Sequence, residues 1–163
     1  MIFVTVGGQM PFNRLVRSVD EWAGTHKNIE FFAQIGRGGW KPEHIAWAEL
    51  LSPPTFRHKI LSADLIIAHA GMGTILNALD LSKRLSVMPR RGYLRETRND
   101  HQVATANRLE SMGLVVQAHD ERELTKHLED IDSITPKKSL SPNASQQLLD
   151  ALTSFISVNK SKQ

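Results

Sequence analysis

The sequence predicts an α/β fold, a Rossmann-like parallel sheet with helices on both faces. Short apolar runs alternate with stretches of helical periodicity between residues 2 and 128, which is typical of βαβ units. Two of the apolar runs end in glycine turns, where sheets of this kind can bind a ligand. The 163 residues, 40% hydrophobic and 23% charged, are enough to bury one core.

The first third of the chain supplies the opening elements of this pattern. Residues 2–6 are apolar and predict a strand, which is followed by Gly7-Gly8-Gln9. A helix is expected next, because apolar residues recur at helical spacing: Phe12, Leu15, Val16, Val19 and Trp22. Then come a strand at 29–34, a cationic glycine loop at 36–39, a strand or short helix at 44–50, and a helix at 53–62 that begins with two prolines.

The stretch from Ala63 to Asn77 combines a strand, a glycine turn and a helix. Residues 64–68 are apolar enough for a buried parallel strand, and a helical pattern begins near Gly73. The glycines between them permit a tight turn and close approach of a ligand, and the free N–H groups of the first helical turn offer an anion site. Backbone conformation alone also explains glycine at such a turn, so both interpretations stay open.

The remaining elements surround one segment that does not resemble a core. Strands are expected at 85–88 and 114–117, and helices at 99–112 and 121–128. Residues 90–102 carry four arginines and several other polar groups. We expect this loop to contact something anionic. It follows a strand, as do the glycine turns after residues 6 and 68, so all three segments should share the carboxyl edge of the sheet.

Three regions are expected along the chain: a domain at 1–130, a polar linker at 131–141, and an amphipathic helix with a frayed tail at 142–163. The apolar stripe of that helix should pack on its own domain or, alternatively, on a partner chain.

The absence of cysteine excludes disulfides and thiolate metal sites. We expect a cytoplasmic protein, since neither a signal peptide nor a membrane span is apparent. A net charge of +3 does not indicate nucleic acid as a partner.

Four motifs together resemble the glycosyltransferase family 28 C-terminal domain over roughly residues 1–128. They are Val4-Thr5-Val6-Gly7, residues 63–74, Pro89-Arg90-Arg91, and Glu96 followed by Asn99-Asp100-His101-Gln102. More closely, the chain is similar to the stand-alone donor-binding subunit of split GT-B glycosyltransferases, such as bacterial PssD/PssE pairs. The cytosolic subunit of the eukaryotic enzyme that adds the second GlcNAc to a dolichol carrier is a more distant likeness.

This resemblance implies a fold equivalent to the C-terminal half of a GT-B enzyme and a division of labour between two chains. The present chain would bind a UDP-sugar and transfer a hexose or uronic acid to a polyprenyl-diphosphate-linked saccharide in bacterial polysaccharide biosynthesis. A membrane-associated, PssD-like subunit would hold the acceptor and recruit this chain to the inner face of the membrane. Without that partner the chain would be inactive.

The resemblance also implies roles for individual residues. The first glycine loop facing the cleft is Gly7, Gly8 and Gln9; the turn and helix N-terminus beside the nucleotide are His69, Gly71, Met72, Gly73 and Thr74. His101 and Gln102 match the pair that hydrogen-bonds the donor sugar, and Glu96, Asn99 and Asp100 match residues that position this pair. Arg90, Arg91 and Arg98 are candidates to neutralise the diphosphate, with a solvated surface role as the alternative.

Asn77 departs from the family pattern, which usually has a glutamate there for the ribose hydroxyls. The implied mechanism is inverting transfer that needs no metal or other cofactor, with the general base expected from the partner chain. His69 and His101 have suitable chemistry for proton transfer, although donor contact is the favoured role and a purely structural role stays open for either. Asp130-Ile131-Asp132 is the only Asp-x-Asp pattern, and we interpret it as a solvated loop rather than a manganese site.

Two other functions stay open. A nucleotide-binding regulatory module without catalysis is the main alternative, and Asn77 makes it more credible. A dinucleotide-dependent oxidoreductase is less favoured, because the first glycine turn lacks Gly-x-Gly-x-x-Gly.

Overall fold

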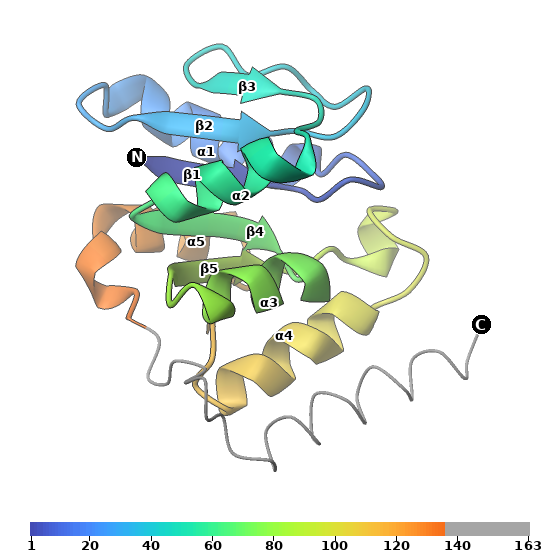
Figure 1. The fold of residues 1–163 in the computed structure, drawn as a ribbon. Coiled ribbons are helices and arrows are strands. Elements are labelled where there is room, and N and C mark those ends of the chain that lie inside the picture. The colour runs from blue at the N-terminus through green and yellow to red at the C-terminus, as the bar shows by residue number, and fades with distance from the viewer. Residues whose placement is uncertain (136–163) are drawn as a thin grey trace.

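The computed structural model describes residues 1–135, which form a six-stranded parallel sheet with helices on both faces (Figure 1). The strand order is β3-β2-β1-β4-β5-β6. This arrangement confirms the predicted Rossmann-like fold. The helix and tail expected at 142–163 lie outside the described residues.

The elements follow the predicted alternation. In chain order they are β1 (Ile2–Thr5), α1 (Asn13–Thr25), β2 (Phe31–Gln34), β3 (Ala46–Ala48), α2 (Pro53–Ser62), β4 (Leu65–His69), α3 (Met72–Asp80), β5 (Arg84–Met88), the 3-10 turn η1 (Gly92–Leu94), α4 (His101–Ser111), β6 (Val116–Gln117), α5 (Glu121–Glu129) and the 3-10 turn η2 (Ile131–Ser133). The ambiguous stretch at 44–50 therefore contains a strand.

Successive residues of each strand contribute to opposite faces of the sheet, as its pleat requires. In β1, Ile2 and Val4 belong to the core under α1 and α5. Phe3 belongs to the core under α2, α3 and α4. Figure 1 shows the latter three helices in front of the sheet and the former two behind it. Both faces are covered, which explains why the strands are largely apolar on both faces.

Several boundaries differ by one or two residues from the predicted ones, including those of α4 and β6. Helix α4 begins at His101 rather than Asn99, because the Asn99 side chain accepts a hydrogen bond from the His101 backbone N–H (3.2 Å) and so initiates the turn. Only Val116–Gln117 of the strand expected at 114–117 pairs in the sheet.

The first residues of the expected linker belong to the folded domain. Ile131–Ser133 form a 3-10 turn, and Ile134 is completely buried in the core under α1 and α5. Asp130 accepts a hydrogen bond from the Ser133 backbone N–H, and Asp132 pairs with Arg84 at 2.8 Å. Both carboxylates of the Asp-x-Asp pattern therefore make local contacts.

Within residues 1–135, no helix is both long and apolar enough to cross a membrane.

Candidate functional site

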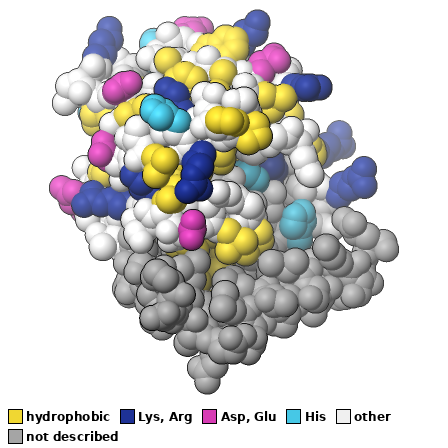
Figure 2. All heavy atoms as spheres, in the orientation of Figure 1, with side chains coloured by type: hydrophobic (Ala, Val, Ile, Leu, Met, Phe, Trp, Pro, Cys, Tyr) yellow, Lys and Arg dark blue, Asp and Glu magenta, His cyan; other side chains and the backbone are white. Residues whose placement is uncertain are grey.

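Three segments meet at the carboxyl edge of the sheet. Strands β1 and β4 are neighbours, and they lead into the turns at residues 7–9 and 70–74. The chain runs from β1 toward β2 on one side, while β5 pairs with β4 on the other, so this is the topological switch point where open α/β sheets bind ligands. Residues 89–102 follow β5 and join the same edge. Figure 2 shows Lys, Arg and His side chains along the right of the view, where the strands end.

The His69 side chain lies between the two glycine turns. A Cβ atom at Gly7 would lie 2.7 Å from His69 Cε1, and one at Gly71 would lie 2.1 Å from His69 Nε2. Gly7 also has a φ of +77°, which favours glycine. Both positions therefore require glycine because the imidazole occupies the space that a side chain would need.

His69 is neutral at physiological pH. Burial, reinforced by the positive charge of Arg90, lowers the pKa of its imidazole to about 4. A neutral imidazole offers one donor and one acceptor nitrogen but no charge. At pH 7, His69 can therefore hydrogen-bond a bound group without contributing cationic charge.

The N-terminus of α3 has free backbone donors. Gly71 is the N-cap residue, and its carbonyl accepts from the amides of Thr74 and Ile75. The amides of Met72 and Gly73 have no acceptor among residues 1–135, as is usual in a first helical turn. Apart from the adjacent residues and the backbone of α3, no atom of residues 1–135 would come within 4 Å of a Cβ at Gly73. The turn thus combines free donors with open space, which suits an anionic group.

Gln102 lies at the start of α4 and is only 7% exposed. Its Oε1 accepts a hydrogen bond from the Arg90 backbone N–H (3.2 Å). This contact orients the side-chain amide and leaves Nε2 as the donor for a bound group. His101, one residue earlier, is exposed, and its Nδ1 contacts Asn99 Oδ1.

Arg90 holds the first glycine loop in place. The residue is 4% exposed, and its guanidinium donates to the carbonyls of Val6 (2.9 Å) and Met10 (2.5 Å). Burial lowers the pKa of Arg90 to about 10, so the group remains charged at pH 7. Arg90 is therefore engaged with backbone carbonyls, which favours a structural role over the expected contact with a diphosphate.

The other charged candidates lie farther along the same segment. Arg91 donates through Nη2 to the His119 carbonyl (2.6 Å), while Arg98 is exposed. Asp100 Oδ1 accepts from the Gly92 backbone N–H at 2.6 Å and so closes the loop upon itself. Of the expected arginines, Arg98 is the one without such a structural contact among the described residues.

Asn77 is exposed on α3 and folds back onto its own helix. Its Nδ2 donates to the Gly73 carbonyl at 2.7 Å. In the first loop, Gly8 and Gln9 are exposed, whereas Thr74 is buried at the start of α3. The predicted residues thus share one edge of the sheet but differ in whether their side chains are free.

Arg14 also belongs to this region, although none of the sequence motifs identifies it. It lies in the first turn of α1, and its guanidinium contacts Glu96 in the segment after β5. A basic residue is unfavourable near a helix N-terminus unless an anion compensates it. This unfavourable position of a basic residue is the one local feature of the sequence that indicates the role of Arg14.

Comparisons with solved structures show the same fold. The NMR structure of ALG13 has a TM-score of 0.61 and 22% identity, covering 93% of this chain and 94% of that one. The glycotransferase of kitacinnamycin has a TM-score of 0.59 and 20% identity, with 81% of this chain and 34% of that one covered. MurG of Acinetobacter baumannii has a TM-score of 0.55 and 18% identity, with 93% and 49% covered. The chain therefore spans nearly all of ALG13 but half or less of the other two.

A family profile identifies the domain more directly. The glycosyltransferase family 28 C-terminal domain matches residues 1–158. A search of curated proteins found no match. Because the family profile extends over nearly the whole sequence, this chain belongs to the glycosyltransferase family 28 C-terminal domain family.

Proposed function

We propose that this chain is the donor-binding catalytic subunit of a two-component inverting glycosyltransferase. Its donor is a UDP-sugar. The group transferred is a hexose or uronic acid, and the acceptor is a polyprenyl-diphosphate-linked saccharide of bacterial polysaccharide biosynthesis. A membrane-associated, PssD-like subunit binds the acceptor and recruits this chain to the inner face of the membrane.

The arrangement at the switch point carries this proposal. The free amides of Met72 and Gly73 lie beside open space at the N-terminus of α3. Such a turn suits the diphosphate of a nucleotide sugar, because backbone donors and the helix dipole both favour negative charge. Gln102 Nε2 supplies a further donor for the sugar hydroxyls. Family membership supplies the reaction class.

The same groups suit the chemistry of sugar transfer. Negative charge develops on the UDP leaving group as the glycosidic bond breaks, and preorganised N–H groups stabilise that charge. Neutral His69 donates or accepts a hydrogen bond at the diphosphate. Exposed His101 contacts the donor sugar. The partner subunit provides the base that takes the proton from the acceptor hydroxyl.

Exposed apolar side chains at the same edge support the need for a partner. Met10 follows β1, Leu50 follows β3, and Tyr93 and Leu94 follow β5. Tyr93 is 72% exposed. Exposed apolar and aromatic groups near a cleft are typical of protein interfaces. We propose that the acceptor-binding subunit covers them and closes the cleft over the donor.

A nucleotide-binding regulatory module is the second candidate. The observation that favours it is Asn77, whose side-chain amide bonds to Gly73 on its own helix. Without a carboxylate there, the ribose hydroxyls lose a charge-assisted acceptor.

Calorimetric titration of the purified chain with UDP, several UDP-sugars and NAD, alone and with the product of any adjacent membrane-protein gene, separates these functions. Selective UDP-sugar binding that the partner strengthens, together with sugar transfer by the pair, is the expected result. Binding without transfer would favour the regulatory module. NAD binding alone would overturn both proposals.

A further inference from the structure

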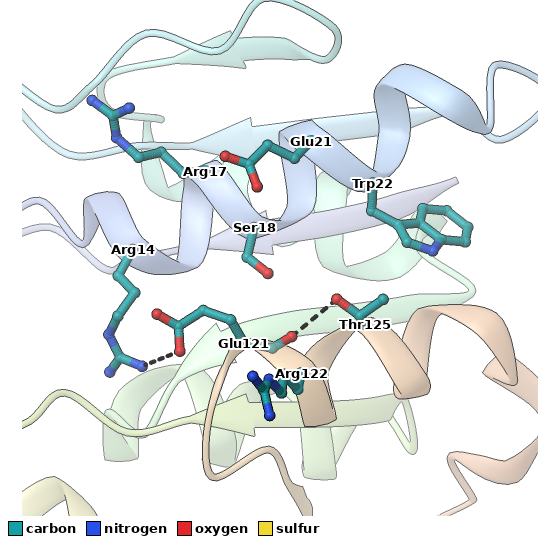
Figure 3. Close-up of a pocket in the computed structure, with 8 residues that line it drawn as sticks. All are labelled: Arg14, Arg17, Ser18, Glu21, Trp22, Glu121, Arg122 and Thr125. Carbon is teal, nitrogen blue, oxygen red and sulfur yellow. Dashed lines mark hydrogen bonds and ion pairs between the residues drawn. The ribbon is translucent and has the colours of Figure 1, made fainter.

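Arg14 joins α1 to the segment that follows β5. Its Nε donates to Glu96 Oε1 at 2.6 Å and its Nη2 donates to Glu96 Oε2 at 2.9 Å, which makes a bidentate pair. The same Nη2 lies 3.3 Å from the Pro89 carbonyl. Nη1 lies 3.2 Å from Glu121 Oε2. Figure 3 shows Arg14 and Glu121 pointing toward each other across the groove between α1 and α5.

The pair with Glu96 is shielded from solvent, whereas the contact with Glu121 is not. The Arg14 and Glu96 side chains are 15% and 13% exposed, but Glu121 is 47% exposed. Burial opposes the charge of Arg14, yet its bonds to Glu96 and the two carboxylate charges raise its pKa above the ordinary value. The Arg14–Glu96 contact should therefore matter more than the contact with Glu121, which solvent screens.

The turn at residues 91–96 contains an unfavourable backbone conformation that side-chain contacts must stabilise. Arg95 has a φ of +58°, in the left-handed region that non-glycine residues rarely adopt. Glu96 follows immediately, and its Oε2 also accepts from the Arg91 backbone N–H at 2.9 Å. One carboxylate thus holds both ends of the turn at residues 91–96 while Arg14 fixes that carboxylate to α1.

The contacts of Arg14 connect it to Gln102 through the backbone of residues 89 and 90. Arg14 holds the Pro89 carbonyl, and the next residue donates its backbone N–H to Gln102 Oε1. We infer that Arg14 is a positioning residue for the sugar end of the donor site: it clamps residues 89–96 onto α1 and thereby orients the Gln102 amide. This inference rests on the proposed function, because it takes Gln102 as a donor contact.

Arg14→Gln tests the clamp, with Glu121→Gln as the matched control that removes only the exposed contact. Isothermal titration in the presence of the partner subunit measures Kd for UDP and for UDP-glucose, UDP-galactose, UDP-N-acetylglucosamine and UDP-glucuronic acid. We expect Arg14→Gln to weaken binding of the preferred UDP-sugar about tenfold, the loss expected for a charged hydrogen-bonded group. UDP itself should bind within about twofold of wild type, since it relies on the α3 turn. Arg14→Lys keeps the charge but loses the bidentate geometry. Its affinity for the preferred UDP-sugar should therefore lie between those of wild type and Arg14→Gln.

Trypsin digestion of the native chain gives a readout that needs no ligand. The clamped residues 89–96 include Arg91 and Arg95, so their release should speed cleavage there in Arg14→Gln but not in Glu121→Gln. Equal cleavage rates and equal UDP-sugar affinities in the two variants would overturn the clamp and leave the proposed function standing. A wild-type chain that binds no uridine nucleotide even with its partner would overturn the proposed function and with it the donor role of Arg14.

Discussion

The two sides of the candidate site are built differently. At the switch point, strands β1 and β4 are paired and buried, and the turns that follow them enclose the His69 ring between Gly7 and Gly71. By contrast, residues 89–102 lie mostly at the surface and are held by the contact of Glu96 with Arg14 and by the contact of Arg90 with the Val6 carbonyl. Backbone pairing makes the first side insensitive to single charges. On the second side, each charged contact can be removed by one substitution.

Under the proposed function, we expect the two sides to have separate tasks. A rigid turn with fixed amides suits the diphosphate, which all UDP-sugars share. A segment held by individual ion pairs can change between relatives without disturbing the sheet, and so it suits recognition of the sugar. Stability should therefore respond to substitutions at the switch point, and donor preference to those in residues 89–102.

Gly71→Val should have the largest effect. Its Cβ would lie 2.1 Å from His69 Nε2, so the imidazole or the turn must move, at a cost of about 3 kcal/mol. Urea denaturation measures the loss. Gly73→Val is the matched control, because among residues 1–135 nothing beyond the adjacent residues and the α3 backbone lies within 4 Å of that Cβ. It should leave the unfolding midpoint nearly unchanged while it blocks uridine nucleotide binding. Equal stability of the two variants would contradict the His69 packing.

The pH dependence of stability should isolate His69. Its pKa is about 4 in the folded chain and about 6.5 when unfolded, so the unfolded state binds more protons between these values. Stability present above pH 6.5 is lost as the pH falls toward 4, by up to about 3 kcal/mol. His69→Gln has no such group and should lose less over this range. Urea denaturation at pH 7.5, 5.5 and 4.5 compares them, and parallel pH profiles would rule out a buried neutral imidazole.

Gln102→Ala should reduce binding of the donor by about 1–3 kcal/mol if Nε2 contacts the sugar, since polar groups are left unpaired. The Arg90 backbone N–H also loses its acceptor. Titration with the UDP-sugar and with UDP separates the two consequences: UDP affinity should change little. An unchanged UDP-sugar affinity in the reconstituted pair would remove Gln102 from the sugar site.

Local patterns predicted the switch-point side well. Apolar runs, glycine turns and helical spacing are properties of neighbouring residues, and they identified β1, β4 and α3 with their turns. The His69 packing was not predictable from these patterns, because Gly7 and His69 come together only when β1 pairs with β4. That contact explains the glycines without any ligand, so glycine at 7 and 71 is weaker support for nucleotide binding than the free amides of Met72 and Gly73.

The side built on residues 89–102 was less predictable. Its four arginines suggested an anionic ligand, but Arg90 and Arg91 donate to backbone carbonyls of the chain itself. The Arg14–Glu96 pair joins residues 82 positions apart, and the sequence contains no pattern that links them. Composition can show that a segment is charged, whereas its partners depend on the tertiary fold.

Asn77→Glu should have the smallest effect and bears on the departure from the family pattern. Asn77 is exposed, so the stability of the domain should change by less than about 0.5 kcal/mol. Uridine nucleotides should bind about 1 kcal/mol more tightly if the ribose lies over α3, because a carboxylate accepts hydrogen bonds more strongly than an amide. Asn77→Gln has the length of Glu without its charge and is the matched control. A gain for Glu alone would place the ribose on the rigid side of the site, whereas no gain for either variant would mean that position 77 does not contact the ribose, and Asn77 would then no longer favour the regulatory module.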